Sequence, residues 1–398
     1  MSSPSNENKL LKLPLEIRES IYGHVLRPHT INKHEKPRHK FDIALFRVNS
    51  QVSKESQTVF NRTYFTILFQ ANSAVLGNLA TENRVPIIHS GKRSRLCKSY
   101  IMKVEVRFSQ IGGGSSSSGD GAVADYFHTI LLLEDLPKFC KTWLYSYGKD
   151  STWYKKFILR INDNGSAIFR NGTLPLELQK KLLFPFGVLE ERDLAEIKGN
   201  WHDPSVEDAL RQMTKTPEAS PLERLEESNR LKDSGNEALS AGELDKALKL
   251  YIQALDELFV ICSGRWRKET RRAYFDVVLN DSPFQFDSGM AVYYLLRAKS
   301  SANILQVYLK MEKYEETLFW GNRAIQTMRE MQGSYDDELG RHTPANDTIG
   351  RIFYRTGVAA RVLGDESEAR QLLRVAEKYL PRDEHIKDEL RKVRLCIG

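Results

Sequence analysis

The sequence lacks several features that would at once define a chemistry. Its 398 residues include only four cysteines, with no CxxC pair and no histidine at zinc-finger spacing, at positions 97, 140, 262 and 396. Neither a disulfide framework nor a structural metal is therefore indicated. No apolar stretch approaches the length of about 18 residues that a membrane span needs, and the N-terminus has no signal-peptide core. We expect an intracellular protein with unpaired thiols, located in the cytoplasm, with the nucleus as an alternative.

Catalytic motifs are missing as well. No GxSxG, HExxH or Rossmann glycine pattern occurs. Four histidines lie in or near a basic loop without carboxylate partners at helical spacing (His24, His29, His34 and His39). Asp120, Glu134 and Asp135 form no recognised catalytic pair. The sequence therefore favours a protein that is not an enzyme and that needs no cofactor and no metal.

Positive charge is unevenly distributed along the chain. Lys and Arg total 59 against 52 Asp and Glu, a net charge of +7. Residues 1–220 hold 31 basic and 23 acidic residues (net +8), and residues 221–398 hold 28 and 29 (net −1). Two basic runs, 91–98 and 265–272, could contact phosphates, and the second includes Trp266. A solvated helix face is the simpler interpretation of such runs, so no nucleic-acid or membrane partner is expected.

Length and pattern together predict more than one domain. A chain of 398 residues with 41% hydrophobic residues is expected to form two or three ordered domains. Residues 1–8 are polar and expected to be disordered. Residues 9–205 mix helical periodicity with β-branched or alternating stretches at 64–69, 104–108 and 157–161, which predicts an α+β domain with a small mixed or antiparallel sheet. Turn-forming residues indicate a linker over 206–222.

The region 223–398 contains an internal repeat. Small residues recur in pairs seven positions apart, a spacing of two helical turns where a neighbouring helix approaches closely, at Ala247/Ala254, Thr317/Ala324 and Ala369/Ala376. Gly235 and Gly357 each precede such a pair by twelve residues and would allow a close helix crossing. Pro381 follows the third pair, and residues 382–397 have the periodicity of a capping helix.

This pattern resembles the tetratricopeptide repeat (TPR), a helix–turn–helix unit of about 34 residues. The resemblance implies an all-α superhelix of three repeats with a C-terminal capping helix. The first positions of the three pairs are 70 and 52 residues apart (247, 317 and 369), so the repeats carry insertions, the first of them around 259–289. That insertion could obstruct the concave groove of the superhelix.

Five polar residues extend the resemblance to a subset of TPR proteins, the co-chaperones with a carboxylate clamp. These bind the C-terminal Glu-Glu-Val-Asp tail of the seventy- and ninety-kilodalton heat-shock chaperones. The corresponding positions here are Lys232, Asn236, Asn303, Arg351 and Arg355. Lysine offers a point charge, asparagine an amide donor and arginine a fork that matches a carboxylate. Arg351 stands where the family usually has lysine, which leaves the preferred chaperone open. The other interpretation is a TPR scaffold without a clamp.

The N-terminal segment Leu13-Pro14-Leu15-Glu16-Ile17-Arg18, with Ile21 and Tyr22 after it, resembles the opening of F-box domains. It is closest to the F-box-like segments of fungal proteins, where an element like residues 44–55 follows. The resemblance implies contact with the adaptor of an SCF ubiquitin ligase through Leu13, Pro14, Ile17 and Ile21. In the other interpretation, these residues form the core of the α+β domain. The alternative function is thus an SCF substrate receptor whose repeats hold a client protein.

Overall fold

The computed structural model describes residues 9–33, 36–73, 75–91, 94, 97, 99–110, 126–147, 153–162, 174–199, 203–284, 287–332 and 345–395. The segment 1–8, expected to be disordered, lies outside these ranges. The chain divides into two compact units, residues 1–217 (unit 1) and 218–398 (unit 2). Cys97, Cys140 and Cys262 are free thiols. Within the described ranges, no helix combines the length and the apolar character that crossing a membrane requires.

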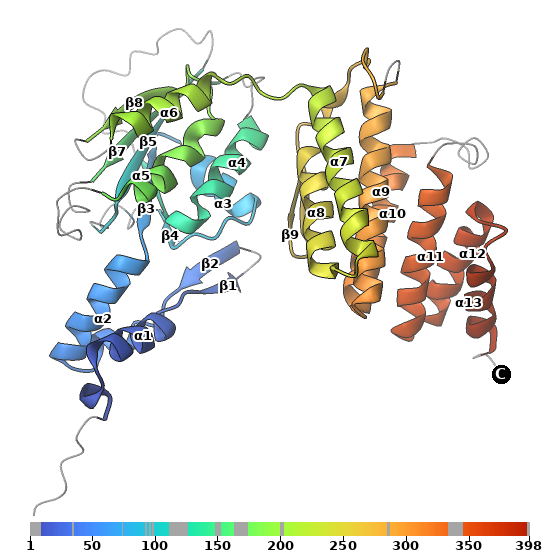
Figure 1. The fold of residues 1–398 in the computed structure, drawn as a ribbon, viewed down its shortest axis with the longest axis horizontal. Helices are drawn as coiled ribbons and strands as arrows, with labels where there is room; N and C mark the ends of the chain where they lie inside the picture. Colours follow the sequence, from blue (N-terminus) through green and yellow to red (C-terminus); the bar gives the residue numbers. More distant parts are fainter. Residues whose placement is uncertain are drawn as a thin grey trace, which may run out of the picture. The chain divides into compact units, whose positions relative to one another are not determined.

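Unit 1 is built on a six-stranded mixed sheet (Figure 1). In sheet order the strands are β4 (His89–Ser90), β6 (Phe127–Leu132), β3 (Thr66–Ala71), β5 (Met102–Gln110), β7 (Trp153–Ile161) and β8 (Leu194–Lys198). The pairs β3–β5 and β7–β8 are parallel, and the other neighbours are antiparallel. Three of these strands coincide with the β-branched or alternating stretches of the sequence.

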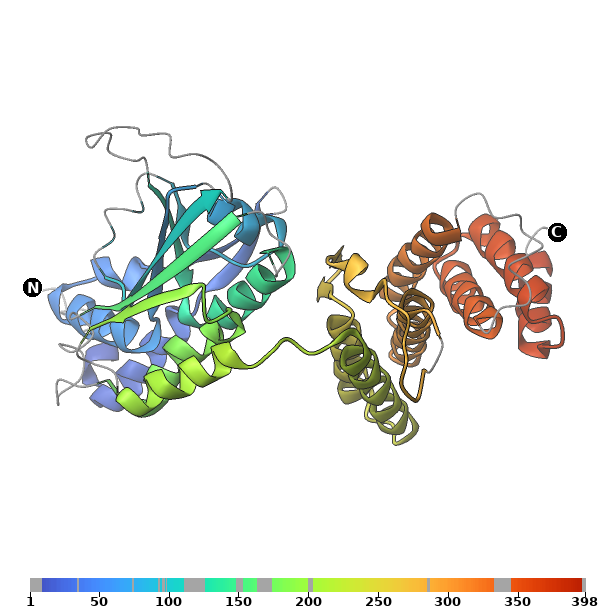
Figure 2. The same ribbon diagram turned by 90° about the horizontal axis from the view of Figure 1, so that it is seen from above.

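Alternate residues of the strands place one apolar face of the sheet against helices. Helices α3 (Val75–Glu82), α4 (Leu136–Tyr147), α5 (Leu176–Leu183) and α6 (Pro204–Lys215) supply the other half of this core (Figure 2). The ring of Phe69 lies 4.5 Å from that of Phe139, and the ring of Trp143 lies 4.9 Å from that of Phe157. Aromatic contacts therefore join β3 and β7 to the same helix, α4.

Helix α6 corrects the predicted linker. It occupies residues 204–215, inside the segment 206–222 that we expected to connect the domains. Asp203 caps its first turn, and Val206 and Leu210 are buried in the core of unit 1. The turn-forming residues that predicted a linker lie around 216–220, and the residues before them have the apolar spacing of a helix. The connection is therefore short, between α6 and the next helix at Pro221.

The N-terminal part of unit 1 forms its own small core. Its elements are η1 (Lys9–Lys12), α1 (Leu15–Val25), β1 (His29–Lys33), β2 (Lys36–Lys40), η2 (Ala44–Arg47) and α2 (Ser50–Thr63). Glu55 of α2 joins the two helices: it accepts hydrogen bonds from Arg18 at 2.8 Å and from the Tyr22 hydroxyl at 2.9 Å. Hydrogen bonds from Arg18, then Gln51, lower the pKa of Glu55 to about 2.

Unit 2 contains three helix–turn–helix pairs and a final helix. The pairs are α7 (Pro221–Ser240) with α8 (Leu244–Glu257), α9 (Gly289–Lys310) with α10 (Tyr314–Gln332), and α11 (Asn346–Val362) with α12 (Glu366–Tyr379). The last helix, α13 (Glu384–Leu395), packs on α12 and α11. The first helices contact one another, α7 with α9 and α9 with α11, and so form one layer (Figure 1). The prediction of helical repeats with a C-terminal helix is confirmed.

The small residues of the repeat lie where the helices approach. All six positions are at most 6% exposed: Ala247, Ala254, Thr317, Ala324, Ala369 and Ala376. A Cβ atom on Gly235 would lie 2.5 Å from the Tyr251 ring, and one on Gly357 would lie 2.9 Å from the Leu373 side chain. Both glycines therefore permit the close crossing of the two helices in their own pair.

The insertion after α8 folds into a hairpin, β9 (Val260–Ser263) and β10 (Trp266–Glu269), followed by η7 (Arg272–Phe275). Its basic run is used inside unit 2. Arg265 pairs with Glu315 and Glu316 of α10, and Arg271 pairs with Glu218. The Arg267 guanidinium lies 4.0 Å from the centre of the Trp320 ring, and burial lowers its pKa to about 10. Our interpretation of 265–272 as a solvated helix face was wrong, because these arginines hold the hairpin in place.

Glu55→Gln is expected to destabilise the N-terminal core at pH 7 by about 2 kcal/mol, because it removes a carboxylate that accepts charged hydrogen bonds. The folded-state pKa of Glu55 is depressed, so its contribution is present above its ordinary value of 4.5 and is lost as the pH falls towards about 2. Urea unfolding of the full-length protein, followed by circular dichroism at several pH values, measures this. The variant and the wild type should converge in acid. The control Glu16→Gln, on the exposed side of α1, should leave stability unchanged; a Glu55→Gln effect independent of pH would contradict the assignment.

Candidate functional site

A cleft of about 460 Å³ runs along the first helices of unit 2. Its lining residues come from α7, α9 and α11, and the polar ones are Lys232, Asn236, Ser240, Lys299, Asn303, Gln306, Lys310, Thr348 and Arg351. We call this cleft the basic groove. None of the described residues of the insertion (259–284 and 287–289) lines it. The insertion therefore does not obstruct the groove, contrary to the concern raised by its length.

Helix α7 contributes Lys232 and Asn236, which are one turn apart. The Lys232 side chain is 11% exposed, and its ammonium group donates to Asn229 at 2.8 Å and pairs with Asp233 at 3.0 Å. The Asn236 carbonyl oxygen accepts hydrogen bonds from the Tyr251 hydroxyl at 2.9 Å and from the Asn303 amide at 2.7 Å. Asn236 is thus oriented by α8 and α9 together. Its own amide nitrogen makes only a long bond of 3.4 Å to Asp233 and can donate to a ligand.

Helix α9 contributes Asn303 and, one turn earlier, Lys299. Lys299 is half-buried, and its burial together with the nearby charge of Lys232 lowers its pKa. Lys299 was not among the binding residues predicted from the sequence. The signal that could have found it is the spacing itself, because Lys299 and Asn303 repeat the Lys-x-x-x-Asn pattern of Lys232 and Asn236.

Helix α11 contributes Arg351 but not Arg355. Arg351 is exposed and lines the groove. The Arg355 guanidinium instead donates to the carbonyl oxygen of Ala302 at 2.6 Å and to the side-chain oxygen of Gln306 at 2.8 Å. Burial, with a smaller effect of Arg351, lowers the pKa of Arg355 to about 10. Four of the five expected residues therefore meet in the groove, and the fifth fastens α11 to α9.

The groove is electropositive. Among the residues that the structure describes, four basic side chains and no carboxylate line it (Lys232, Lys299, Lys310 and Arg351). Within the described part of unit 2, Asp233 is the one carboxylate that forms an ion pair with any of them. Because a cleft with one sign of charge concentrates ions of the other sign, this arrangement favours an anionic ligand.

Most apolar residues of the segment 13–21 are exposed to solvent. Leu13 is 37% exposed and Ile17 50%, Pro14 is also exposed, and Ile21 is half-buried. The helix instead buries Arg18 and Tyr22 against α2. The interpretation of Leu13, Pro14 and Ile17 as core residues is therefore wrong. These side chains are available for contact with another protein.

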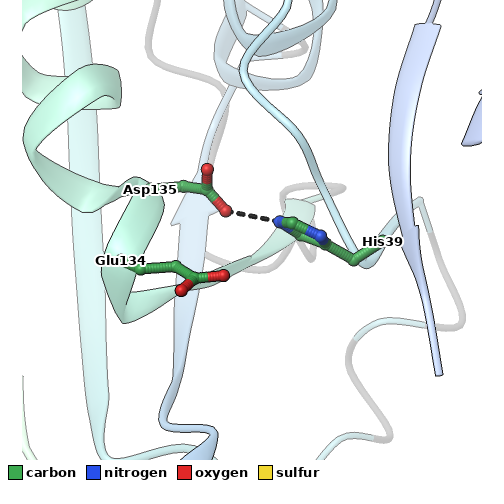
Figure 3. Close-up of side chains that lie close together, drawn as sticks. All are labelled: His39, Glu134 and Asp135. Atoms are coloured by element: carbon green, nitrogen blue, oxygen red, sulfur yellow. Dashed lines mark hydrogen bonds and ion pairs between the residues drawn. The ribbon is translucent and has the colours of Figure 1, made fainter. Parts of the chain in front are cut away.

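One histidine–carboxylate cluster occurs among the described residues, formed by His39, Glu134 and Asp135 (Figure 3). One potential ligand atom from each lies within 4.8 Å of the others. His39 Nε2 is 2.6 Å from an Asp135 carboxylate oxygen, and the His39 backbone N–H donates to Ile87. These bonds fasten β2 to Asp135, which directly precedes α4, and to the main body of unit 1. His39 and Asp135 are 96 residues apart in the sequence, so no local spacing could join them.

A larger hollow of about 780 Å³ lies in unit 1. Aromatic and aliphatic residues dominate its walls, among them Tyr64, Phe65 and Phe184. On its rim Glu177 and Lys180 pair with each other at 2.9 Å. The hollow offers apolar contact without the converging donors that the basic groove has.

Comparison with solved structures gives likenesses that include two TPR domains. No family model and no curated protein matches the chain. The C-terminal TPR-containing domain of a Plasmodium falciparum FK506-binding protein is 17% identical over 45% of this chain and 94% of that one, with a TM-score of 0.31. The first TPR of Spaghetti (RPAP3), bound to the HSP90 peptide SRMEEVD, is 17% identical over 43% and 94%, with a TM-score of 0.27. What this chain binds is therefore inferred from the residues of its own groove.

The two arginines of α11 should behave differently when replaced. Arg355→Ala removes two charged hydrogen bonds between buried groups and is expected to lower the stability of unit 2 by about 2 kcal/mol. Arg351→Ala removes an exposed side chain and should change stability by less than about 0.5 kcal/mol. Urea unfolding of the two full-length variants tests this. Equal stabilities would show that Arg355 is not engaged between the helices.

Proposed function

We propose that unit 2 is a non-enzymatic protein-interaction domain whose basic groove binds an acidic C-terminal peptide. The peptide is of the Glu-Glu-Val-Asp type found at the ends of heat-shock chaperones. One observation carries this proposal: Lys232, Asn236, Asn303 and Arg351 converge in a groove whose described lining contains no carboxylate. An interaction adaptor of the cytoplasm or nucleus is the class of protein that this proposal implies.

The chemistry of a peptide's last residue matches these groups. A terminal aspartate presents its α-carboxylate and its side-chain carboxylate within a few ångströms of each other. Lysine ammonium groups neutralise the two charges, and asparagine amides donate hydrogen bonds without adding charge. The Asn236 amide is already held by Tyr251 and Asn303. Such preorganised donors reduce the entropy that binding costs.

Other anionic ligands fit the groove less well. No aromatic side chain of the described residues lines it, so the described lining offers a single-stranded nucleic acid no stacking surface. Ser240 and Thr348 are the hydroxyl residues of this lining, which contains no histidine or carboxylate that could activate them. These features support binding rather than catalysis.

Titration of the full-length protein with a peptide ending in Glu-Glu-Val-Asp tests the proposal, with the C-terminally amidated peptide as the control. The free acid should bind with a Kd of about 1 μM, roughly −8 kcal/mol. Amidation removes one carboxylate and should weaken binding at least about tenfold, and Arg351→Ala should also weaken it. Affinities should fall as salt is raised. Equal affinity for the acid and the amide would contradict the proposal.

A second candidate function concerns unit 1, and the exposure of Leu13, Pro14 and Ile17 favours it. In this proposal the segment recruits the SCF adaptor and the repeats hold a client. Co-purification of the adaptor with the full-length protein tests it. Ile17→Asp should abolish capture because it places a charge in an apolar contact. Leu176→Asp, at a similarly exposed apolar position of unit 1, should not. Equal capture by both variants would rule the proposal out.

A further inference from the structure

Helices α7 and α9 present the same pair of side chains to the basic groove. Lys232 and Asn236 are four residues apart on α7, and Lys299 and Asn303 are four residues apart on α9. Residues at this spacing lie on one face of a helix. The two asparagines are joined by a hydrogen bond of 2.7 Å, and all four side chains line the groove. The two pairs therefore form a compact group of two cations and two amides.

The two lysines are close enough to affect each other. Lys232 lowers the pKa of Lys299, in addition to the larger effect of burial. Lys232 has Asn229 and Asp233 as partners, whereas no described side chain forms a hydrogen bond or an ion pair with Lys299. Holding two positive charges together in a partly buried groove is unfavourable, and Asp233, which pairs with Lys232, offsets only part of their repulsion. A ligand with two neighbouring carboxylates would remove this cost.

Arg355, the second arginine that the resemblance implies for carboxylate binding, is not available to a ligand. Arg355 is bonded to Ala302 and Gln306 and does not line the groove. Arg351 alone remains on α11. Lys299 supplies a further cation from another helix, because it lines the groove together with Lys232 and Asn303.

We propose that Lys299 is a ligand-binding residue that holds, together with Lys232, the two carboxylates of the peptide's last residue. Asn236 and Asn303 donate to the same carboxylates. This inference rests on the proposed function of the groove, and it assigns the role expected of Arg355 to a residue on a different helix.

Another cation of the groove then serves an earlier residue of the tail. Lys310 follows Lys299 by eleven residues on α9, roughly 16 Å along the helix axis. An extended peptide covers this distance in about five residues. Lys310 is therefore placed for an acidic side chain that precedes the terminal residue.

Titrating single variants with both the free-acid and the amidated peptide separates a direct contact from a general electrostatic effect. Lys299→Met keeps the aliphatic stem and removes the charge. Lys249→Met makes the same change on an exposed position of α8, outside the groove. Each full-length variant and the wild type are titrated with the peptide ending in Glu-Glu-Val-Asp and with its amidated twin.

Lys299→Met should weaken binding of the free acid about tenfold and binding of the amide much less, so that amidation costs less affinity in the variant than in the wild type. Lys249→Met should change both affinities by less than about twofold. The unfolding midpoint of Lys299→Met should be at least that of the wild type, because a repulsion is removed.

The outcomes distinguish this inference from the function on which it rests. A wild type that does not prefer the acid over the amide would overturn the proposed function, and this inference with it. A wild type that prefers the acid, with Lys299→Met unaffected or weakened equally for both peptides, would overturn the role of Lys299 alone. A lower unfolding midpoint for Lys299→Met would likewise overturn it and show that Lys299 supports packing.

Discussion

The groove of unit 2 depends on how Tyr251 joins three helices. Its ring fills the space that Gly235 leaves open on α7, and its hydroxyl holds the Asn236 carbonyl oxygen. That oxygen also accepts the amide of Asn303 on α9. A side chain larger than hydrogen at position 235 would displace the ring, and the two asparagines would lose their common anchor. The close helix packing of the repeat and the placement of polar donors in the groove are therefore one structural feature.

The groove is positively charged because acidic residues of unit 2 form ion pairs elsewhere. The half of the chain that contains it has a net charge near zero. Several carboxylates form ion pairs in or around the insertion. Glu218 pairs with Arg271, and Glu269 pairs with Arg272 and with Arg297 of α9. None of these residues lines the groove, and the charged side chains in its described lining are all cations. Local placement therefore matters more for binding than the whole-chain charge of +7.

Local patterns in the sequence predicted local structure well. The small residues seven apart identified the helix pairs, because close packing restricts residue size at each crossing. The resemblance to clamp-bearing TPR proteins implied that Lys232, Asn236, Asn303 and Arg351 share one groove, because helical spacing alone relates only residues of the same helix. The contact of Arg355 with α9 could not be predicted. Helical spacing fixes the position of its Cα atom but not whether its guanidinium reaches the Ala302 carbonyl oxygen or a ligand. Ion pairs between residues far apart in the sequence, such as Arg265 and Glu315, could not be predicted from local patterns either.

The central claim is that the groove holds the free carboxylates of a peptide's last residue through Asn236 and Asn303. Side-chain amide resonances of these two asparagines, measured by ¹⁵N NMR in the full-length protein, report on that contact directly. Both pairs of resonances should shift when the peptide ending in Glu-Glu-Val-Asp is added, and should shift far less with its amidated form. Unchanged resonances at saturating free acid, or equal shifts with both peptides, would contradict the account.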